Sequence, residues 1–277
     1  MIRRVINFLG ELSMKLGLCV EMALTKLPFE KRIEQAAKLG FKFAEMWFVD
    51  MTYKGSPEDL AGIAKKNKVT ITNTVIGAPD GSVGGGLTNP KNLKPWLERT
   101  KLTLDFNQRA NIPATIVCTG NTVAGMSEAK MYRSVVEGLK ATAELAEKAG
   151  ITLLLEPLNT RYDHAGYWLA DSDKGGAICR EVGSRNLKML FDCYHMQIME
   201  GDLVNHIQKN IDVIGHFHSA GVPGRHELFL GETNYPFLLK QIEGMGYQGV
   251  FAMEYSPSMD DVKSLKQTLA YLKLKSE

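Results

Sequence analysis

The chain lacks the cysteine pairs, long apolar runs and charge excess that would each assign it to a specialised class. Its four cysteines, Cys19, Cys118, Cys179 and Cys193, show no Cys-x-x-Cys spacing, which favours buried free thiols in a reducing cytoplasm over disulfides or a zinc site. No stretch approaches the roughly 20 apolar residues that span a bilayer. The formal net charge is only +2, so nothing suggests electrostatic capture of nucleic acid. We therefore expect a cytoplasmic protein with neither a membrane nor a nucleic-acid partner.

A glycine motif for phosphate or dinucleotide binding is also missing. Glu21-Met22-Ala23 follows the first expected strand, where a doubly wound sheet would carry its glycine fingerprint. The glycine-rich stretch 81–86 is not followed by the Gly-Lys-Ser/Thr of a P-loop. We expect the loop 77–90 to be either a mobile lid over a barrel mouth or a plain flexible surface loop.

What the sequence does contain is a regular alternation of strand and helix signals. Ser56-Pro57-Glu58-Asp59, for example, combines an N-cap serine, a proline at the first helical position and acids in the first turn. The expected strands are 16–20, 43–48, 69–75, 114–118, 152–155, 187–191, 214–217 and 249–253. Eight such units in 277 residues with 44% apolar residues predict an α/β fold, a (β/α)8 TIM barrel, rather than an open sheet.

We expect residues 14–277 to form this single barrel domain. Residues 1–13 are basic and then mildly apolar, too short and interrupted for a secretory signal. They are expected to be an N-terminal extension, either an appended helix or an over-long gene start.

The last four expected strands each end on a residue that can bind a metal ion. Glu156, Asp192, His218 and Glu254 follow one another at steps of 36, 26 and 36 residues, about one βα unit each. In a parallel α/β barrel all strand C-termini open on one face, where catalytic residues collect. Three carboxylates and one imidazole suit Mn²⁺, Mg²⁺ or Co²⁺ better than a structural zinc, and crowded carboxylates repel one another without a cation. We predict one shared divalent cation.

Two glutamates beside a cation indicate proton transfer next to a carbonyl group. The cation would polarise the carbonyl and hydroxyl of an α-hydroxy-ketone or α-hydroxy-aldehyde and stabilise the enediolate. Glu156 and Glu254 would then act as the acid/base pair, one taking a proton from one carbon and the other returning it at the next. Hydrolysis by metal-bound water is the competing use of such a site.

Four further residues are expected at the substrate. His195 would donate a hydrogen bond to substrate oxygens or serve as a helix cap, and Arg225, on a Pro-Gly loop, would clamp a carboxylate or hydroxyls or lie on the surface. Trp47 would wall the pocket or belong to the core. Glu45 is either a substrate contact or a buried polar partner, and His216 is expected to support the site rather than complete a second metal centre.

Taken together, these residues resemble the hydroxypyruvate isomerase family of the xylose-isomerase-like barrels. The resemblance extends from Met14 onward. It is densest in Leu155-Glu156-Pro157-Leu158-Asn159, Phe191-Asp192-Cys193-Tyr194-His195-Met196-Gln197, Met199-Glu200-Gly201-Asp202-Leu203, Val222-Pro223-Gly224-Arg225-His226-Glu227, Gly231-Glu232-Thr233-Asn234-Tyr235 and Glu254-Tyr255-Ser256-Pro257. It implies metal-assisted isomerisation of a small hydroxy-oxo acid, such as hydroxypyruvate to tartronate semialdehyde. It also implies that Glu156 and Glu254 are the catalytic pair, and that Asp192 and residue 218 belong to the metal site.

The chain departs from that family at the pocket. Position 218 tends to be Gln in the family, whereas His216-Phe217-His218 resembles the related ketose 3-epimerases. Ser256 replaces a common Lys, and Leu228-Phe229-Leu230 replaces a Pro-Gly-Thr-like turn. These changes bear on the substrate more than on the chemistry, since losing the Lys suits a less acidic or a larger, neutral substrate.

Three other functions stay open on the sequence alone. A ketose 3-epimerase acting on a free sugar keeps the chemistry and changes the substrate. An abasic-site endonuclease shares the barrel, but only six histidines and a charge of +2 argue against its larger metal cluster and basic surface. A non-catalytic sugar-binding protein is the last. Homo-oligomers are common among similar barrels.

Overall fold

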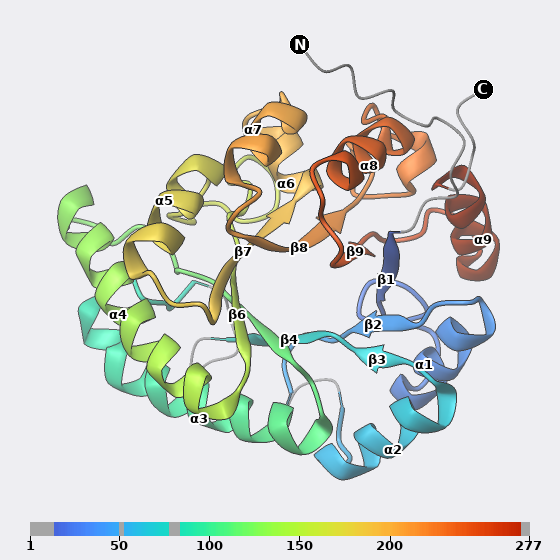
Figure 1. The fold of residues 1–277 in the computed structure, drawn as a ribbon, viewed down its shortest axis with the longest axis horizontal. Helices are drawn as coiled ribbons and strands as arrows, with labels where there is room; N and C mark the ends of the chain where they lie inside the picture. Colours follow the sequence, from blue (N-terminus) through green and yellow to red (C-terminus); the bar gives the residue numbers. More distant parts are fainter. Residues whose placement is uncertain (1–13, 50–52, 78–83, 273–277) are drawn as a thin grey trace.

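The computed structural model describes residues 14–49, 53–77 and 84–272. Within these residues, nine short parallel strands form one sheet that curls into a barrel surrounded by helices (Figure 1). The expected extension 1–13 lies outside the described residues, as does the 78–83 part of the expected lid loop. The TIM barrel prediction is confirmed.

The barrel closes at a single interrupted strand. The strand order is β3-β2-β1-β9-β8-β7-β6-β5-β4, so β3 (Thr70–Ile71) and β4 (Asn73–Ile76) stand at opposite ends although only Thr72 separates them. The backbone N–H of Met46 donates to the carbonyl of Asn73 at 3.3 Å, and that of Val75 to the carbonyl of Trp47 at 3.1 Å. These bonds continue the pairing across the break, so β3 and β4 together occupy the place of one barrel strand.

The elements follow the expected order along the chain. The other strands are β1 (Lys15–Cys19), β2 (Phe43–Glu45), β5 (Ala114–Val117), β6 (Thr152–Leu155), β7 (Leu187–Asp192), β8 (Ile214–Ser219) and β9 (Val250–Met253). The helices are α1 (Phe29–Lys38), α2 (Pro57–Asn67), α3 (Leu93–Ala110), α4 (Glu128–Ala149), α5 (Ser172–Val182), α6 (Cys193–Met199), α7 (Leu203–Asn210), α8 (Tyr235–Gly244) and α9 (Asp261–Leu272), with 3-10 turns at η1 (Pro90–Asn92) and η2 (Leu228–Leu230).

Local signals in the sequence set where the helices begin and end. At the start of α2, the Ser56 side chain accepts from the Asp59 backbone at 3.1 Å, and the Asp59 carboxylate accepts from the Ser56 backbone at 3.3 Å. This reciprocal capping box satisfies two N–H groups that the helix leaves open. At the end of α4, Gly150 adopts φ 68°, a left-handed conformation that glycine reaches without steric cost.

Helix α6 is an element that the sequence reading did not anticipate. It begins directly after β7, because Asp192 both ends the strand and caps the helix. Its Oδ1 accepts from the backbone N–H groups of Tyr194 at 2.7 Å and His195 at 3.3 Å. One residue therefore serves two elements, and the usual loop signal between a strand and a helix is missing.

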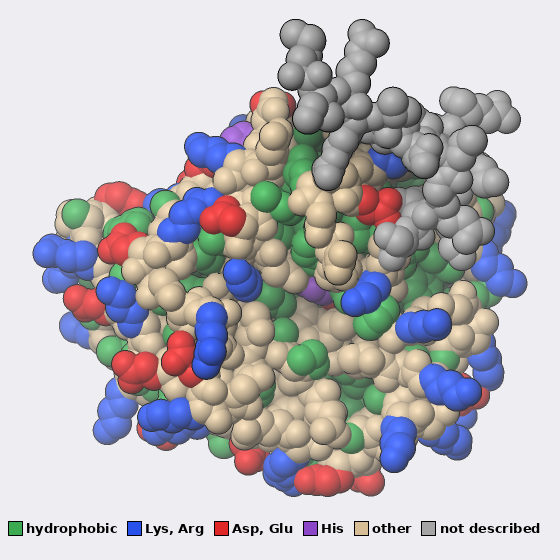
Figure 2. Space-filling view, viewed as in Figure 1, with side chains coloured by type: hydrophobic (Ala, Val, Ile, Leu, Met, Phe, Trp, Pro, Cys, Tyr) green, Lys and Arg blue, Asp and Glu red, His purple; other side chains and the backbone are tan. Residues whose placement is uncertain are grey.

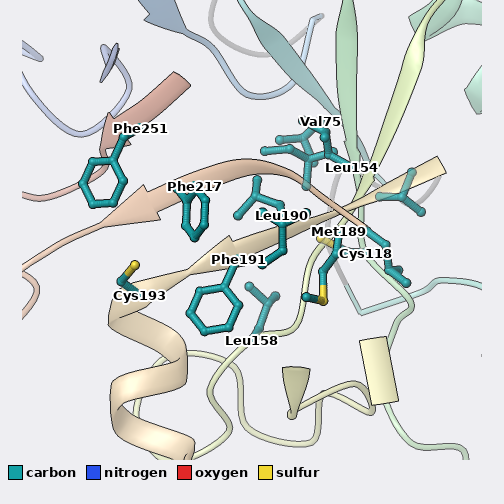
Figure 3. Close-up of a cluster of buried hydrophobic side chains, with 14 of the residues drawn as sticks. Val75, Cys118, Leu154, Leu158, Met189, Leu190, Phe191, Cys193, Phe217 and Phe251 are labelled. Carbon is teal, nitrogen blue, oxygen red and sulfur yellow. The ribbon is translucent and has the colours of Figure 1, made fainter. Parts of the chain in front are cut away.

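Alternation along the strands separates the two faces of the sheet. The rings of Phe191, Phe217 and Phe251 lie along neighbouring strands (Figure 3), with centroids 5.9 Å apart in each adjacent pair. Phe251 also contacts Tyr235 of α8, so this face packs against helices. Because successive side chains on a strand point to opposite faces, Asp192 and His218, which pair with each other across β7 and β8, face the barrel interior.

The surface charges and the state of the cysteines are as expected from the near-neutral charge and the cysteine spacing. Lys and Arg side chains are interspersed with Asp and Glu around the margin of the face in Figure 2. All four cysteines are buried free thiols, as predicted. Among the described helices, none has the length and apolar character needed to cross a bilayer.

Candidate active site

Four side chains from four neighbouring strands meet at one end of the barrel. Glu156 follows β6, Asp192 ends β7, His218 lies in β8 and Glu254 follows β9. All four are buried, and each offers a ligand atom within 4.8 Å of the others. Nδ1 of His218 lies 3.6 Å from Oε1 of Glu156 and 3.3 Å from Oε2 of Glu254. The structure thus brings the predicted set together, while the ligand roles stay a prediction.

The charges in this cluster are strongly coupled to one another. Burial opposes ionisation of Glu254, but His218 and Arg225 outweigh it and hold the pKa of Glu254 well below its usual range. Burial likewise lowers the pKa of His218, but the carboxylates of Glu254 and Glu45 raise it well above the ordinary value. At Asp192 burial dominates over the opposing charges of Arg225 and His218, and raises the pKa to about 7. Protons thus balance part of the negative charge.

The donor atoms fit a divalent cation. Nδ1 of His218 is buried and has no hydrogen-bond partner among the described residues, although it faces two carboxylates. A buried polar atom without a partner is costly unless a ligand satisfies it. Three carboxylates with one imidazole form the oxygen-rich set that Mn²⁺, Mg²⁺ and Co²⁺ accept.

Beneath the cluster, Glu45 crosses the barrel interior from β2 to β8. Its Oε1 lies 2.5 Å from Nε2 of His216, and its Oε2 lies 2.9 Å from Nε2 of His218. On the intervening strands β1 and β9, Cys19 pairs with Glu45 and Ala252 pairs with His218. Burial raises the pKa of Glu45, but the two imidazoles outweigh it and bring the pKa to about 2. Glu45 is therefore an ionised anchor for both histidines.

A cavity of about 180 Å³ opens beside the cluster. Trp47, His195 and Arg225 line it together with Glu156 and Glu254, and the remaining lining is largely apolar. Nε1 of Trp47 donates to Oε1 of Glu254 at 3.0 Å, so the indole both walls the cavity and orients a glutamate. Glu45, expected as either a substrate contact or a buried polar partner, lies below among the histidines, and its substrate contact stays a prediction.

Arg225 places its guanidinium within the site from the loop after β8. It pairs with Glu254, lies 3.8 Å from Oδ2 of Asp192, and covers the ring of Tyr194 at 5.1 Å. Its backbone has φ 57°, a left-handed conformation uncommon outside glycine. Arg225 also lines a second cavity of about 610 Å³ on its outer side. The arginine thus stands between the cluster and the surface.

His195 lies at the start of α6 and is completely buried. Its Nδ1 faces two nitrogen donors of Asn159, the side-chain Nδ2 at 2.7 Å and the backbone N at 3.3 Å. Its Nε2 lies 3.4 Å from Oδ2 of Asp192. We assigned no role to Asn159 from the sequence. Its position three residues after Glu156 was the available signal, but a loop residue's partner cannot be derived from spacing.

A closed parallel barrel with acidic side chains gathered at the ends of its strands is the arrangement found in barrel enzymes, and the chain falls in this class. The chain matches the family model described as Xylose isomerase-like TIM barrel over residues 33–275, and it belongs to that family.

Among its relatives, hydroxypyruvate isomerase of Escherichia coli strain K12 is 31% identical over 255 residues, which cover 91% of this chain and 94% of that protein. The 2-oxo-tetronate isomerase of Cupriavidus necator is 45% identical over 141 residues, about half of each chain, 51% here and 54% there. The chain is therefore an isomerase.

Solved structures show the same architecture. An AP endonuclease, family 2, from Brucella melitensis is 26% identical, with a TM-score of 0.86 over 93% of this chain and 99% of that one. A D-psicose 3-epimerase from Clostridium cellulolyticum H10 is 19% identical, with a TM-score of 0.75 over 94% and 98%, and this likeness concerns the fold alone.

Proposed function

We propose that the chain is a metal-dependent isomerase that interconverts a small hydroxy-ketone and hydroxy-aldehyde of the hydroxypyruvate and tartronate-semialdehyde type. The observation that carries the proposal is the placement of two buried glutamates, Glu156 and Glu254, both beside Nδ1 of His218 at the edge of one small cavity. The names of the relatives, hydroxypyruvate isomerase and 2-oxo-tetronate isomerase, support a short hydroxy-oxo acid as the substrate class.

Glu156, Asp192, His218 and Glu254 would hold the cation, with Mn²⁺, Mg²⁺ or Co²⁺ as candidates. When bound, it supplies Lewis-acid polarisation of the substrate carbonyl and hydroxyl. Glu45 beside Nε2 of His218 favours a proton on that nitrogen, which leaves Nδ1 as the donor atom toward the cluster.

The proton transfer belongs to the two glutamates. His218 and Arg225 hold Glu254 ionised, so this carboxylate is ready to take a proton from the carbon beside the carbonyl. A protonated Glu156 then gives its proton to the neighbouring carbon while the hydroxyl proton passes to the former carbonyl oxygen, which completes the exchange of ketone and aldehyde. The proton on Glu254 is released to solvent and Glu156 takes one up, which restores both carboxyl groups. The apolar walls of the cavity limit water around the intermediate and so strengthen the electrostatic interactions within it.

The remaining cavity residues orient the substrate. Arg225 brings a positively charged guanidinium to the cavity wall, and a guanidinium can hold a carboxylate or paired hydroxyls. His195 contributes an N–H group to a substrate oxygen, and Trp47 closes the wall over Glu254. The buried free thiols suit a reducing compartment, and we place the protein in the cytoplasm.

The test is turnover of hydroxypyruvate in deuterated water, followed by NMR. We expect product formation with deuterium entering at the reacting carbons, loss of turnover after chelation, and its return with Mn²⁺, Mg²⁺ or Co²⁺. Glu156→Gln and Glu254→Gln should each lower kcat by about 10²–10⁴-fold. Full activity of the chelated protein would contradict the mechanism.

A second candidate is 3-epimerisation of a free ketose, which the histidine at position 218 favours. The same NMR experiment with fructose and tagatose decides between the two. Deuterium exchange at C3 of the ketose without turnover of hydroxypyruvate would replace the acid by a sugar as substrate and leave the roles of Glu156 and Glu254 unchanged.

A further inference from the structure

We propose that Asn159 is a positioning residue that holds His195 as a neutral imidazole with its proton on Nε2, so that His195 donates a hydrogen bond into the cavity. The identity of the accepting oxygen rests on the proposed function. The proton's position on the ring rests on the contacts of Asn159 alone.

The orientation of the Asn159 amide is determined by its neighbours. Its Oδ1 accepts from the backbone N–H groups of Tyr162 at 3.0 Å and Asp163 at 3.2 Å. Backbone nitrogens only donate, so the atom facing them must be the oxygen. The NH₂ group therefore lies on the other side, where Nδ2 donates to Oδ2 of Asp163 at 2.5 Å and meets Nδ1 of His195 at 2.7 Å.

Two donors consequently converge on one ring nitrogen. The Asn159 side chain and the Asn159 backbone N–H, at 3.3 Å, both point at Nδ1 of His195. A nitrogen that accepts from two N–H groups carries no proton of its own, so the ring proton lies on Nε2.

The protonated nitrogen is the one available to a ligand. Nε2 of His195 is buried and lies 3.4 Å from Oδ2 of Asp192, but it forms no hydrogen bond within the described part of the chain. His195 lines the cavity beside Glu156 and Glu254. A ring whose Nδ1 accepts hydrogen bonds and carries no proton is neutral. A neutral N–H donor of this kind stabilises negative charge that develops on a substrate oxygen.

A purely structural role for Asn159 is the alternative, because its Oδ1 also closes the turn through Tyr162 and Asp163. The two roles differ in one observable, the protonation of the His195 ring. Asn159→Asp places an accepting carboxylate against Nδ1 and so requires a proton there. Asn159→Ala removes the side-chain donor and keeps the backbone N–H, so the ring should keep its proton on Nε2 with weaker restraint.

The experiment is ¹H–¹⁵N multiple-bond NMR of the histidine rings in protein without added metal, combined with steady-state kinetics of the metal-loaded enzyme. The chain has six histidines, and the His195→Asn variant identifies the signals of His195. We expect Nδ1 unprotonated in the wild type and in Asn159→Ala, and protonated in Asn159→Asp. Turnover should fall about 100-fold in Asn159→Asp, as on loss of an oxyanion donor, and about tenfold in Asn159→Ala.

Asn107→Ala is the matched control. Asn107 is equally buried and hydrogen-bonds Thr74 and the carbonyl of Ala114, away from the cavity. It should leave the His195 signals unchanged. A proton on Nδ1 in the wild type, or unchanged protonation in folded Asn159→Asp, would overturn the assignment. If Asn159→Asp does not fold, Asn159→Ala with a proton on Nδ1 would overturn it equally. A wild type with the expected ring but no turnover of any acid would contradict the proposed function and support this assignment.

Discussion

His218 and His195 are each held through one ring nitrogen, but through different nitrogens and by chemically different partners. His218 presents Nε2 to the carboxylate of Glu45 and turns Nδ1 toward the acidic cluster. His195 presents Nδ1 to the N–H groups of Asn159 and turns Nε2 toward the cavity. The first partner is a carboxylate oxygen 2.9 Å from the ring, and the second is a pair of N–H donors. The comparison teaches that the group on the far nitrogen decides whether an imidazole offers a lone pair to a cation or an N–H to a substrate.

The two arrangements also differ in the elements that support them. Glu45 reaches His218 between strands β2 and β8 across the barrel, whereas Asn159 lies in the loop after β6 and holds a residue of α6. Strands of a closed sheet move less than loops. We therefore expect the cation side of the site to be rigid, and the substrate side to carry the variation that tunes specificity.

The largest expected effect comes from removing each ring in turn. His218→Asn should lower the affinity for Mn²⁺ by more than about 100-fold. Removing a residue that only supports a metal ligand already lowers affinity by up to about 100-fold, and activity should fall with the affinity. His195→Asn should leave Mn²⁺ affinity within about twofold while kcat falls about 10²–10³-fold. Isothermal titration and steady-state kinetics measure the two effects, and equal loss of metal affinity in both variants would remove the distinction.

The pH dependence of metal binding should follow the His218 side only. In the metal-free protein the pKa of Asp192 is raised to about 7 and that of His218 well above its usual value. The cation must expel both protons, so affinity rises with pH. Below pH 7 the cation displaces two protons, so its affinity should rise about 100-fold per pH unit. Above pH 7 it displaces one proton, and its affinity should rise about tenfold per pH unit. Titrations between pH 6 and 8 measure this slope, which His195→Asn should leave unchanged; a flat profile would contradict it.

Glu45→Gln should weaken the cation site without touching the substrate side. The amide has one oxygen in place of the two carboxylate oxygens that face His216 and His218, and it carries no negative charge. His218 therefore loses its anchor. We expect a 10–100-fold loss of Mn²⁺ affinity and no change in the His195 ring signals. Glu200→Gln is the control, since Glu200 also lies beside an imidazole, 3.7 Å from Nδ1 of His206, but away from the cluster. A similar loss in both variants would point to general destabilisation rather than to the anchor.

The smallest effect is expected from Tyr194→Phe. The Tyr194 hydroxyl donates to Oδ2 of Asp163 at 3.0 Å, the same oxygen that accepts from Asn159. Removing it loosens Asn159 indirectly, at a cost of about 1 kcal/mol for one hydrogen bond, or roughly fivefold in kcat. Metal affinity should not change. Tyr132→Phe, which removes a hydroxyl bonded to Glu181 at the surface, should have no effect on either quantity.

The sequence was sufficient for the barrel and for the convergence of the four strand-end residues, because parallel strands bring their C-terminal ends to one face. It singled out Glu45 as a substrate contact or a buried polar partner, but it did not predict which histidines Glu45 contacts or what Asn159 contacts. Glu45 and His216 are 171 positions apart along the chain, and no local pattern reveals a contact at that separation. The orientation of Asn159 depends on hydrogen bonds from Tyr162 and Asp163 and on a contact with His195, 36 positions away.

The inner face of β2 and its continuation carries Glu45 and, two residues later, Trp47. Glu45 contacts His218, and Trp47 contacts the Glu254 carboxylate. At the usual rise of a strand these two positions are about 6.6 Å apart, so this one segment contacts the site at two depths. Substitutions on its opposite face, at Ala44 or Met46, would change packing alone. Insertion or deletion of a single residue within the strand ahead of Glu45 would turn both Glu45 and Trp47 to the outer face, so the length of this segment should vary less than its composition.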